Sequence, residues 1–429
     1  MHFKRMTAVP VVPMKRAVRT ASGAIAEAPL LLVDLATKEG RRRPGARPKR
    51  SAICLRPPEE RGRGKGGRMK DIVVKHEKLR AGIAALLAAS GSDEREARIV
   101  SDHLVEANLK GHDSHGVGMV PLCVRHIKEG KLKLNRRLKL VRDDGPFLVG
   151  DGQMGHGQVV AMELTDHAIA RAKQQGVAVA GLVMSHHIGR VGTYGERCAE
   201  AGLVSLHFVN VAGHRALVAP FRGTDARFNT NPICLTLPAT GANPPTILDF
   251  ATSKIALGKV RVAKNKGERV AEDTLLDAKG RPTTDPNVMF VEPPTPAGAV
   301  VTFGEHKGYG LALFAEIFGA ALVGGRTIAP HHPRAHGIIN NMLEIVIDPA
   351  RLSDMKHMKA EIDAVFAYFK ASPPSDPAAP VLVPGEPERL SRAARGASGI
   401  PIDAVTWGEL KAAADTAGLG AAKFEALAK

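Results

Sequence analysis

The apolar residues of this chain recur at the period of an α-helix in some segments and form continuous runs in others. Ile72, Leu79, Ile83 and Leu87 follow the helical period, in which every third or fourth side chain lies on one face. They predict an amphipathic helix that ends at Gly91, because glycine readily adopts the left-handed conformation that closes a helix.

Two further helices can be placed by their ends. Asp93, followed three residues later by Glu96, has the pattern of a capping box and predicts a helix that continues to Gly111. A third helix is predicted over residues 159–175, since its period stops at Gly176. The first part of the patterned chain is therefore expected to be largely helical.

Uninterrupted apolar runs predict buried strands, and the clearest of them is Val177–Met184. Shorter runs predict further strands at residues 204–209, 247–250, 300–303 and 343–347. The longest apolar run, residues 311–323, is too short to cross a membrane and contains Glu316, so it predicts a buried core helix. Because helices and strands alternate along the chain, the sequence predicts an α/β fold.

Residues 1–68 follow neither period and carry most of the net charge. They hold 17 of the 60 Lys and Arg residues but only 5 of the 43 Asp and Glu residues, and so account for +12 of the formal net charge of +17. A strongly basic chain is typical of nucleic-acid-binding proteins, but here the excess lies outside the patterned part. We expect a disordered extension, joined to a reading frame whose natural start is Met69.

Residue spacing argues against a Rossmann dinucleotide-binding motif and against paired cysteines. The only GxGxxG match, which begins at Gly62, has no strand before it and no helix after it, so it is not a Rossmann fingerprint. No CxxC pair occurs, and the four cysteines are far apart: Cys54, Cys123, Cys198 and Cys234. That spacing favours a reducing compartment, and we expect a cytoplasmic protein.

Two polar turns carry side chains suited to acid–base chemistry. One is His112–His115, with the sequence HDSH, which could equally be a capped helix end with surface histidines. The other follows the predicted strand at residues 177–184 and contains His186, His187 and Arg190. Histidine titrates near neutrality and suits a general acid, and arginine can bind a carboxylate, although the histidines could simply satisfy loop backbone groups.

A third histidine group, His331, His332 and His336, raises the alternative of a metal hydrolase. Neither the helical HExxH spacing nor a cysteine partner accompanies these residues. We therefore expect a surface loop and no metal.

Taken together, several stretches resemble the malate/L-lactate dehydrogenase type 2 family, which is unrelated to the Rossmann lactate dehydrogenases. They are GHDSHGVGM (111–119), GHGQVVA (155–161), SHHIGRVG (185–192), TNPICLTLP (230–238), LDFATS (248–253), GRPTTDP (280–286), HKGYGLAL (306–313) and VPGE (383–386). Within the family, the chain looks most similar to the hydroxycarboxylate dehydrogenase branch, whose members reduce 2-oxoglutarate and aryl pyruvates. Malate/L-lactate, ureidoglycolate and sulfolactate dehydrogenases of the same family remain alternatives.

The resemblance implies an NAD(P)-dependent enzyme that interconverts 2-oxo and 2-hydroxy acids, with no nucleic-acid or membrane partner. It implies a three-layer α/β domain with a mixed sheet, which is not a Rossmann fold, packed on a helical part formed by both chain ends. We place the N-terminal helical part at residues 69–150, the cofactor-binding domain at 151–350 and the C-terminal helical part at 351–429. The family's members are homodimers with the site near the subunit interface.

The resemblance also implies roles for individual residues. His187 matches the catalytic acid/base, and His115 matches a histidine at the junction of cofactor and substrate. Ser114 and Arg190 are assigned to the substrate. The implied cofactor contacts are His115, Gly189, Arg190, Val191, Ile247, Leu248, Asp249, Phe250, Ala251, His306, Lys307, Asn340, Gly385, Glu386, Pro387 and Glu388.

The chain departs from the family pattern at three positions. Met119 stands where most members have an arginine that faces the substrate carboxylate, and Arg190 stands where most have a small residue. We expect Arg190 to have taken over carboxylate binding; the alternative is that Arg190 contacts cofactor phosphate while Arg125 or a partner-subunit residue holds the carboxylate. Asn229 stands where the family has a glycine; if that position needs a positive φ, asparagine is the least costly replacement for glycine.

Overall fold

A computed structural model describes residues 12–20, 23–28, 71–292, 295, 297–334 and 337–429. The chain divides into two units, residues 1–66 and 67–429. In the first unit, β1 (Val12–Thr20) and β2 (Gly23–Ala28) form an antiparallel pair, which differs from the disorder that we expected there. The remainder of that expectation, including the start at Met69, concerns residues outside the described ones.

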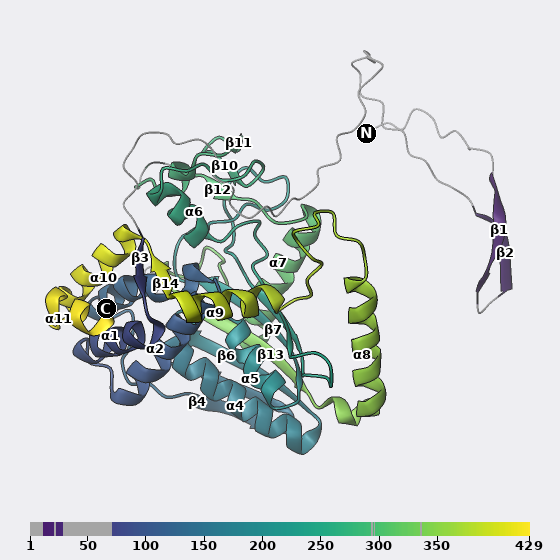
Figure 1. Ribbon diagram of the computed structural model, residues 1–429, viewed down its shortest axis with the longest axis horizontal. Helices are drawn as coiled ribbons and strands as arrows, with labels where there is room; N and C mark the ends of the chain where they lie inside the picture. Colours follow the sequence, from purple (N-terminus) through teal and green to yellow (C-terminus); the bar gives the residue numbers. More distant parts are fainter. Residues whose placement is uncertain (1–11, 21–22, 29–70, 293–294, 296, 335–336) are drawn as a thin grey trace, which may run out of the picture. The chain divides into compact units, whose positions relative to one another are not determined.

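The second unit is built on a seven-stranded sheet (Figure 1). Its strands, in spatial order, are β4 (Lys139–Asp144), β5 (Phe147–Asp151), β6 (Val177–Ser185), β13 (Ile339–Ile347), β7 (Val204–Ala212), β8 (Ile233–Leu237) and β9 (Thr246–Phe250). Only the β5–β6 pair is parallel, so the sheet is mixed. The sequence had placed β4 and β5 with the helical part, and it gave no signal for β8.

Helices cover both faces of this sheet. Helices α4 (Gly157–Gln175) and α5 (Gly192–Glu200) lie on one face, where Thr165 of α4 hydrogen-bonds to Glu344 of β13. On the other face, Phe318 of α7 (His306–Gly319) packs against Phe208 of β7, with ring centroids 5.4 Å apart. The expected α/β fold with three layers and a mixed sheet is confirmed.

Both ends of the second unit build the helical part. Its helices are α1 (His76–Ala89), α2 (Glu94–Leu109), α3 (Val120–Lys128), α10 (Ala404–Thr416) and α11 (Ala421–Ala428). They share one apolar core, in which Leu79, Leu104, Leu410 and Phe424 are fully buried. The short strands β3 (Ile72–Val74) and β14 (Ile400–Ile402) pair antiparallel, so Ile72, which the sequence placed in a helix, belongs to a strand.

A smaller layer lies at one edge of the unit and consists of α6 (Leu257–Asn265) and the strands β10 (Leu275–Leu276), β11 (Pro282–Thr283) and β12 (Ala299–Val300). It has its own apolar core, which includes Val260, Leu275 and Met289. The first turn of α6 packs directly on the HDSH turn, since a Cβ on Gly258 would lie 2.3 Å from Cβ of Ser114. This layer therefore covers one side of the functional site described below.

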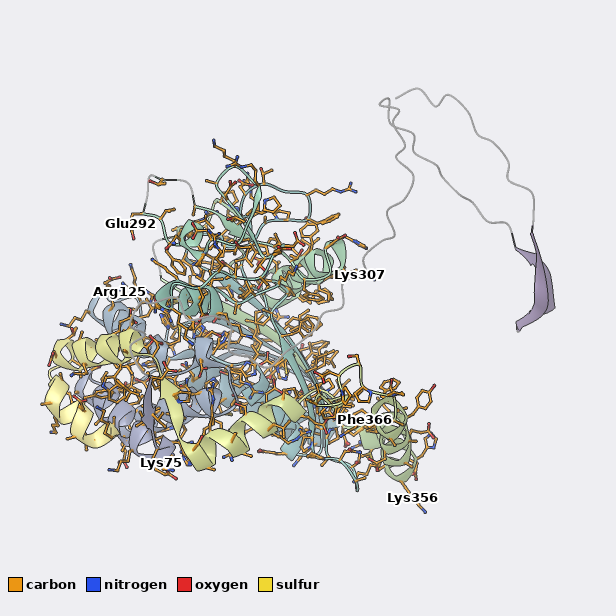
Figure 2. The ribbon with its side chains drawn as sticks, turned by 45° about the horizontal axis from the view of Figure 1, so that its top comes forward. Lys75, Arg125, Glu292, Lys307, Lys356 and Phe366 are labelled. Carbon is orange, nitrogen blue, oxygen red and sulfur yellow. The ribbon has the colours of Figure 1, made fainter. Side chains whose placement is uncertain are left out.

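Two helices expose apolar side chains to solvent. The sequence predicted that α7 would be buried, but Leu313, Phe314 and Ile317 are 47%, 55% and 43% exposed, and Glu316 is buried instead. Helix α8 (Met355–Lys370) buries none of its residues, and Figure 2 shows its Lys356 and Phe366 at the edge of the unit. Helix α9 (Glu386–Ser398) packs against α2. No helix among the described residues is long and apolar enough to cross a membrane.

Candidate active site

A cavity of about 360 Å³ opens where the helical part, the sheet and α6 meet. The HDSH turn contributes Ser114 and His115, and the loop after β6 contributes His187 and Gly189. Apolar side chains form most of the remaining wall: Met119, Leu122, Val191, Val209, Val211, Leu217, Leu257, Phe290 and Ile338. The size and the apolar wall are those of a small-molecule site.

His187 is held by a loop with little freedom. Strand β6 ends at Ser185, whose hydroxyl donates to the backbone oxygen of Asn340 at 3.0 Å. The side-chain oxygen of Asn340 accepts from the backbone N–H of Ile188 at 3.0 Å. Gly189 has φ +74° and lies so close to His103 that a Cβ would meet its Nε2 at 2.2 Å, so only glycine fits there.

The ring of His187 has one nitrogen available to a ligand. Its Nδ1 is buried and has no hydrogen-bond partner among the described residues, which leaves Nε2 to face the cavity. Burial lowers the pKa of His187 well below its usual value, and His115 and His103 lower it further. His187 is therefore neutral at pH 7, with Nε2 placed to exchange a proton with a bound molecule.

His115 lies beside His187. The two rings are nearly parallel, with an interplanar angle of 11° and centroids 5.6 Å apart. Nδ1 of His115 is 3.0 Å from the hydroxyl of Ser114, and the turn is held because Arg395 binds the carboxylate of Asp113. Burial lowers the pKa of His115 to about 4, although Asp249 opposes this effect. Two neutral imidazoles therefore lie on one side of the cavity.

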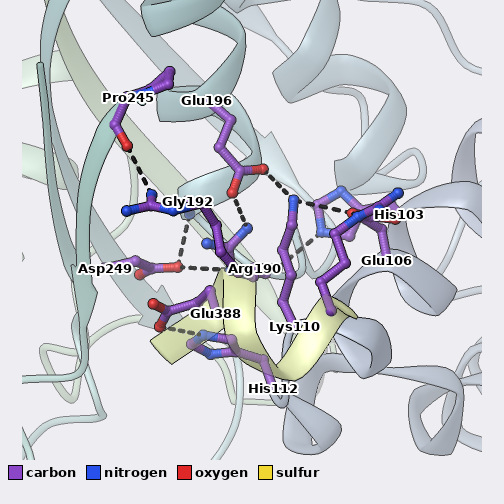
Figure 3. A network of polar contacts seen from close by, with 12 residues as sticks. His103, Glu106, Lys110, His112, Arg190, Gly192, Glu196, Pro245, Asp249 and Glu388 are labelled. Atoms are coloured by element: carbon purple, nitrogen blue, oxygen red, sulfur yellow. Dashed lines mark hydrogen bonds and ion pairs between the residues drawn. The ribbon is translucent and has the colours of Figure 1, made fainter. Parts of the chain in front are cut away.

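Arg190 occupies a different environment from the one that we expected (Figure 3). Its side chain is 2% exposed, and its Nη1 donates to Glu196 at 2.8 Å while its Nε lies 3.7 Å from Asp249. It does not line the cavity. The structure therefore gives no support to the prediction that Arg190 binds the substrate carboxylate, because the carboxylates of Glu196 and Asp249 already neutralise its guanidinium.

Comparisons with known proteins agree with this geometry. A family model described as malate/L-lactate dehydrogenase matches residues 74–411. The chain belongs to the malate/L-lactate dehydrogenase family. It is 45% identical over 331 residues to hydroxycarboxylate dehydrogenase B of Escherichia coli, covering 77% of this chain and 90% of the relative. It is 38% identical over 326 residues to an L-lactate dehydrogenase of Cupriavidus necator, covering 76% of this chain and 92% of the relative.

Solved structures of the family have the same fold. A candidate malate/lactate dehydrogenase from Escherichia coli superposes with a TM-score of 0.78 at 43% identity, over 83% of this chain and 98% of that one. Sulfolactate dehydrogenase from Methanocaldococcus jannaschii superposes with a TM-score of 0.70 at 30% identity, over 82% of this chain and 99% of that one. The chain is therefore an oxidoreductase of a family that acts on hydroxycarboxylates.

The structure brings together most of the expected cofactor residues of this dehydrogenase. Gly189, Val191 and Asn340 line the cavity beside His115 and His187. Strand β9 and the residue after it supply the expected segment Ile247–Ala251, and the adjoining turn is Gly385–Glu388.

Both groups adjoin the charged network of Figure 3. Asp249 accepts from the backbone N–H of Gly192 at 2.7 Å, and Glu388 lies 3.1 Å from His112. Gly385 begins α9 with φ +91° and lies against β9, because a Cβ there would come 3.2 Å from the backbone nitrogen of Ile247.

His306 and Lys307 lie elsewhere. Both are exposed at the beginning of α7, and neither lines the cavity (Figure 2). The ring centroid of His306 is 5.9 Å from that of Phe221. The structure of one chain therefore does not bring these two residues to the site that the resemblance implied.

Sequence reasoning missed several residues of the cavity wall. Asn229 does not have a positive φ, so the condition under which asparagine would be the least costly replacement for glycine is not met. Its Nδ2 instead donates to the backbone oxygen of Val211 at 2.8 Å, and its Oδ1 is buried without a partner among the described residues. Arg261 of α6 also lines the cavity, whereas Arg125 is exposed on α3 and does not (Figure 2). No motif singled out Asn229 or Arg261 as a binding residue.

The residues present fit a nicotinamide ring. The unpartnered Oδ1 of Asn229 matches the amide N–H of a carboxamide, and the apolar residues Val191 and Val209 match the face of a planar ring.

Among the described residues, no group of three or more His, Cys, Asp or Glu side chains is arranged to hold a metal ion. His331 and His332 pack against each other with centroids 4.1 Å apart, and His336 lies outside the described residues.

Proposed function

We propose that this dehydrogenase interconverts 2-oxo acids and 2-hydroxy acids, with Nε2 of His187 exchanging the proton on the C2 oxygen. When bound, NAD(P)H supplies the hydride that reduces C2. The observation that carries the proposal is the ring of His187: one nitrogen is buried without a partner, and the other faces a cavity that also contains His115. Among the described residues, no other histidine that lines the cavity lies in the loop that Asn340 anchors.

The lowered pKa of His187 indicates how the proton moves. A neutral imidazole is a base, so the free enzyme is prepared to take the hydroxyl proton of a 2-hydroxy acid. In the reductive direction the ring must first gain a proton, and the negative charge of a bound oxo acid favours this gain. The same residue then acts as the acid for the C2 oxygen.

Of the two substrate types that we expect, the wall of the cavity favours aryl pyruvates over 2-oxoglutarate. Met119, Leu122, Leu217 and Phe290 surround the space beyond the two imidazoles. A 2-oxoglutarate, malate or sulfolactate side chain would bring a second anionic group, and the wall holds one cationic side chain, Arg261, among the described residues. The malate/(S)-sulfolactate dehydrogenase of Methanothermus fervidus is 31% identical to this chain.

A panel of 2-oxo acids with NADH and with NADPH, followed at the absorbance band of the reduced nicotinamide, tests this function. We expect the highest kcat/KM for phenylpyruvate or a close analogue, and lower values for 2-oxoglutarate and sulfopyruvate, which carry a second anionic group. No oxidation of either cofactor with any 2-oxo acid would overturn the proposal. A preference for oxaloacetate or sulfopyruvate would retain the reaction and contradict the substrate class.

We also propose that the enzyme is a cytoplasmic homodimer in which α7 and α8 contact a second copy. The exposed side chains of Leu313, Phe314, Tyr368 and Phe369 support an interface on these helices. Light scattering on purified protein tests the assembly, and Phe314→Asp should lower the measured mass to that of one chain. Val141→Asp, which changes an exposed apolar residue on β4, is the matched control and should leave the mass unchanged.

A further inference from the structure

Arg261 is a cation without a partner on the wall of the cavity. It is half-buried on α6, and no hydrogen bond or ion pair joins its guanidinium to any other described residue. Most other arginines near the site are paired, as Arg190 is with Glu196 and Arg395 is with Asp113. An arginine held in a cavity without a counterion is an unused binding group.

The local packing fixes where this guanidinium lies. Gly258 and Arg261 are three residues apart on α6 and therefore lie on the same face of the helix. Gly258 rests on Ser114, with a Cβ that would come 2.3 Å from that of the serine. Nη2 of Arg261 would lie 3.7 Å from a Cβ on Gly118, beside the wall residue Met119. The guanidinium thus lies against Gly118, in the short helical turn that follows the turn carrying His115.

The charge of the cavity favours an anion at this place. The residues that line it include no Asp or Glu and, besides Arg261, no Lys or Arg. Burial lowers the pKa values of His115 and His187, so both imidazoles are neutral at pH 7. Arg261 is therefore the one fixed positive charge on the described wall.

A second cavity, of about 150 Å³, lies on the other side of Arg261 and is lined by three acids, Asp71, Asp113 and Asp403. Asp113 is already bound by Arg395, and Asp403 accepts from the backbone N–H of Thr406 at the start of α10. Asp71 is exposed, and no ion pair joins it to Arg261. The guanidinium therefore has no fixed counterion in either cavity and can bind a ligand in the larger one.

We propose that Arg261 binds the C1 carboxylate of the substrate and so directs its C2 oxygen toward Nε2 of His187. This assignment rests on the proposed function, and it replaces the one that the sequence gave to Arg190. A planar guanidinium can hold both carboxylate oxygens at once, which fixes the rotation of the adjacent carbonyl. Arg261 is accordingly a substrate-binding residue that determines the preference for acids over neutral carbonyl compounds.

The test compares a 2-oxo acid with its neutral 2-oxo amide in the wild-type enzyme and in Arg261→Gln. We expect Arg261→Gln to lower kcat/KM for phenylpyruvate by roughly 100-fold to 1000-fold, as loss of one partner of a charged pair does, and to change kcat/KM for phenylpyruvamide only a few-fold. The KM for the reduced nicotinamide cofactor should stay within about twofold. The wild-type preference for acid over amide should therefore nearly disappear.

Two further variants make the result unambiguous. Lys266→Gln removes an exposed cation just after the same helix and should leave the acid-to-amide preference unchanged. Arg261→Lys keeps the charge but loses the two-point contact, and it should lower kcat/KM for the acid by about tenfold. It also serves as the test if Arg261→Gln does not fold, which its circular dichroism and melting temperature will show.

The outcomes separate this inference from the proposed function. A wild-type enzyme that reduces no 2-oxo acid contradicts the function itself. A wild-type enzyme that is active, with Arg261 variants that lose activity equally on acid and amide, overturns only the role of Arg261. A defect confined to the KM of the cofactor also overturns it and would assign Arg261 to the dinucleotide.

Discussion

His187 and Arg190 lie three residues apart in one loop, yet their surroundings give them different roles. His187 has an unpartnered nitrogen and borders the cavity, whereas Arg190 is enclosed by Glu196 and Asp249. Arg190 is almost fully buried and His187 is only partly buried, a difference that the sequence of the loop does not show. What separates them is the direction of each side chain relative to the loop.

At the same scale, His187→Asn tests the proton donor. Asparagine keeps a polar group of similar size but cannot exchange a proton near neutral pH. We expect kcat for 2-oxo acid reduction to fall by about two to four orders of magnitude, while cofactor affinity, measured by fluorescence titration, changes little. Turnover within a few-fold of the wild type would exclude His187 as the donor and transfer the role to His115.

The pH dependence of the two directions should differ because the pKa of His187 lies well below its usual value. The reductive direction needs the protonated ring, so kcat/KM for the oxo acid should keep rising as pH falls from 8 to below 6.5. The oxidative direction needs the neutral ring and should be independent of pH above about 6.5. Initial rates in both directions test this, and a reductive plateau already reached at pH 6.5 would contradict it.

At the scale of elements, the site depends on close contacts between backbones. Helix α6 can approach the HDSH turn because residue 258 is a glycine, and the loop after β6 can approach α2 because residue 189 is a glycine. Asn340 of β13 joins the same loop to the centre of the sheet. Each contact depends on a small or polar residue whose partner is distant in the chain.

Gly258→Ala tests the contact between α6 and the HDSH turn. The added Cβ would lie 2.3 Å from that of Ser114, so the helix or the turn must move. We expect a loss of about 1–3 kcal/mol in the free energy of unfolding and at least tenfold in kcat/KM, since Arg261 moves with the helix.

The matched control for this change is Gly408→Ala in α10. A Cβ at Gly408 meets nothing within 4 Å, so alanine there should be neutral or should stabilise the helix by up to about 1 kcal/mol. Urea unfolding and steady-state kinetics on both variants supply the measurements. Equal effects of the two substitutions would show that the contact with Ser114 is not tight.

At the scale of the whole molecule, buried histidines make stability depend on pH. Burial lowers the pKa of His103 to about 3, and the pKa values of His115 and His156 to about 4. In the unfolded chain these groups take up protons near pH 6.5, so their contribution to stability is complete above that pH and is lost as pH falls toward 4. Glu344, whose pKa burial raises to about 8, opposes the trend, as do Glu96 and Glu316, whose pKa values burial also raises, but the histidines with lowered pKa values outnumber these acids.

We therefore expect the free energy of unfolding to decrease between pH 6.5 and pH 5, by up to about 1.4 kcal/mol per pH unit for each such histidine. Urea unfolding at several pH values measures this. His156→Asn removes one of the groups and should make the decrease shallower. A free energy of unfolding that is constant or rises over this range would show that these histidines are protonated in the folded enzyme.

The division of the chain into two units leads to a prediction about the basic extension. The expected catalytic residues, the sheet and all three apolar cores lie in residues 67–429. Removal of residues 1–68 should therefore leave the melting temperature and kcat/KM within experimental error of the full chain. Loss of soluble, active enzyme on truncation would assign those residues a role in folding.

Local sequence determined the elements whose signals are local. The N-cap at Asp93, the left-handed end at Gly176 and the apolar run of β6 all lie where the pattern placed them, because each depends on neighbours within a few residues. The second half of the predicted capping box does not form, because the backbone N–H of Asp93 donates to Asn135 and not to Glu96. The order of short motifs also indicated the family, its fold and the loop that carries His187.

Only the tertiary structure decided which side chains share the cavity. Short strands such as β8 carry too few residues to show a period. Ile72 belongs to a strand because it pairs with β14, and β14 lies more than 300 residues away in the chain. Arg190 and Arg261 look alike in sequence, but Glu196, in the helix just after the loop, and Asp249 of β9 neutralise the first, and helix packing leaves the second free in the cavity. Such pairings depend on contacts across the fold, which no spacing along the chain encodes.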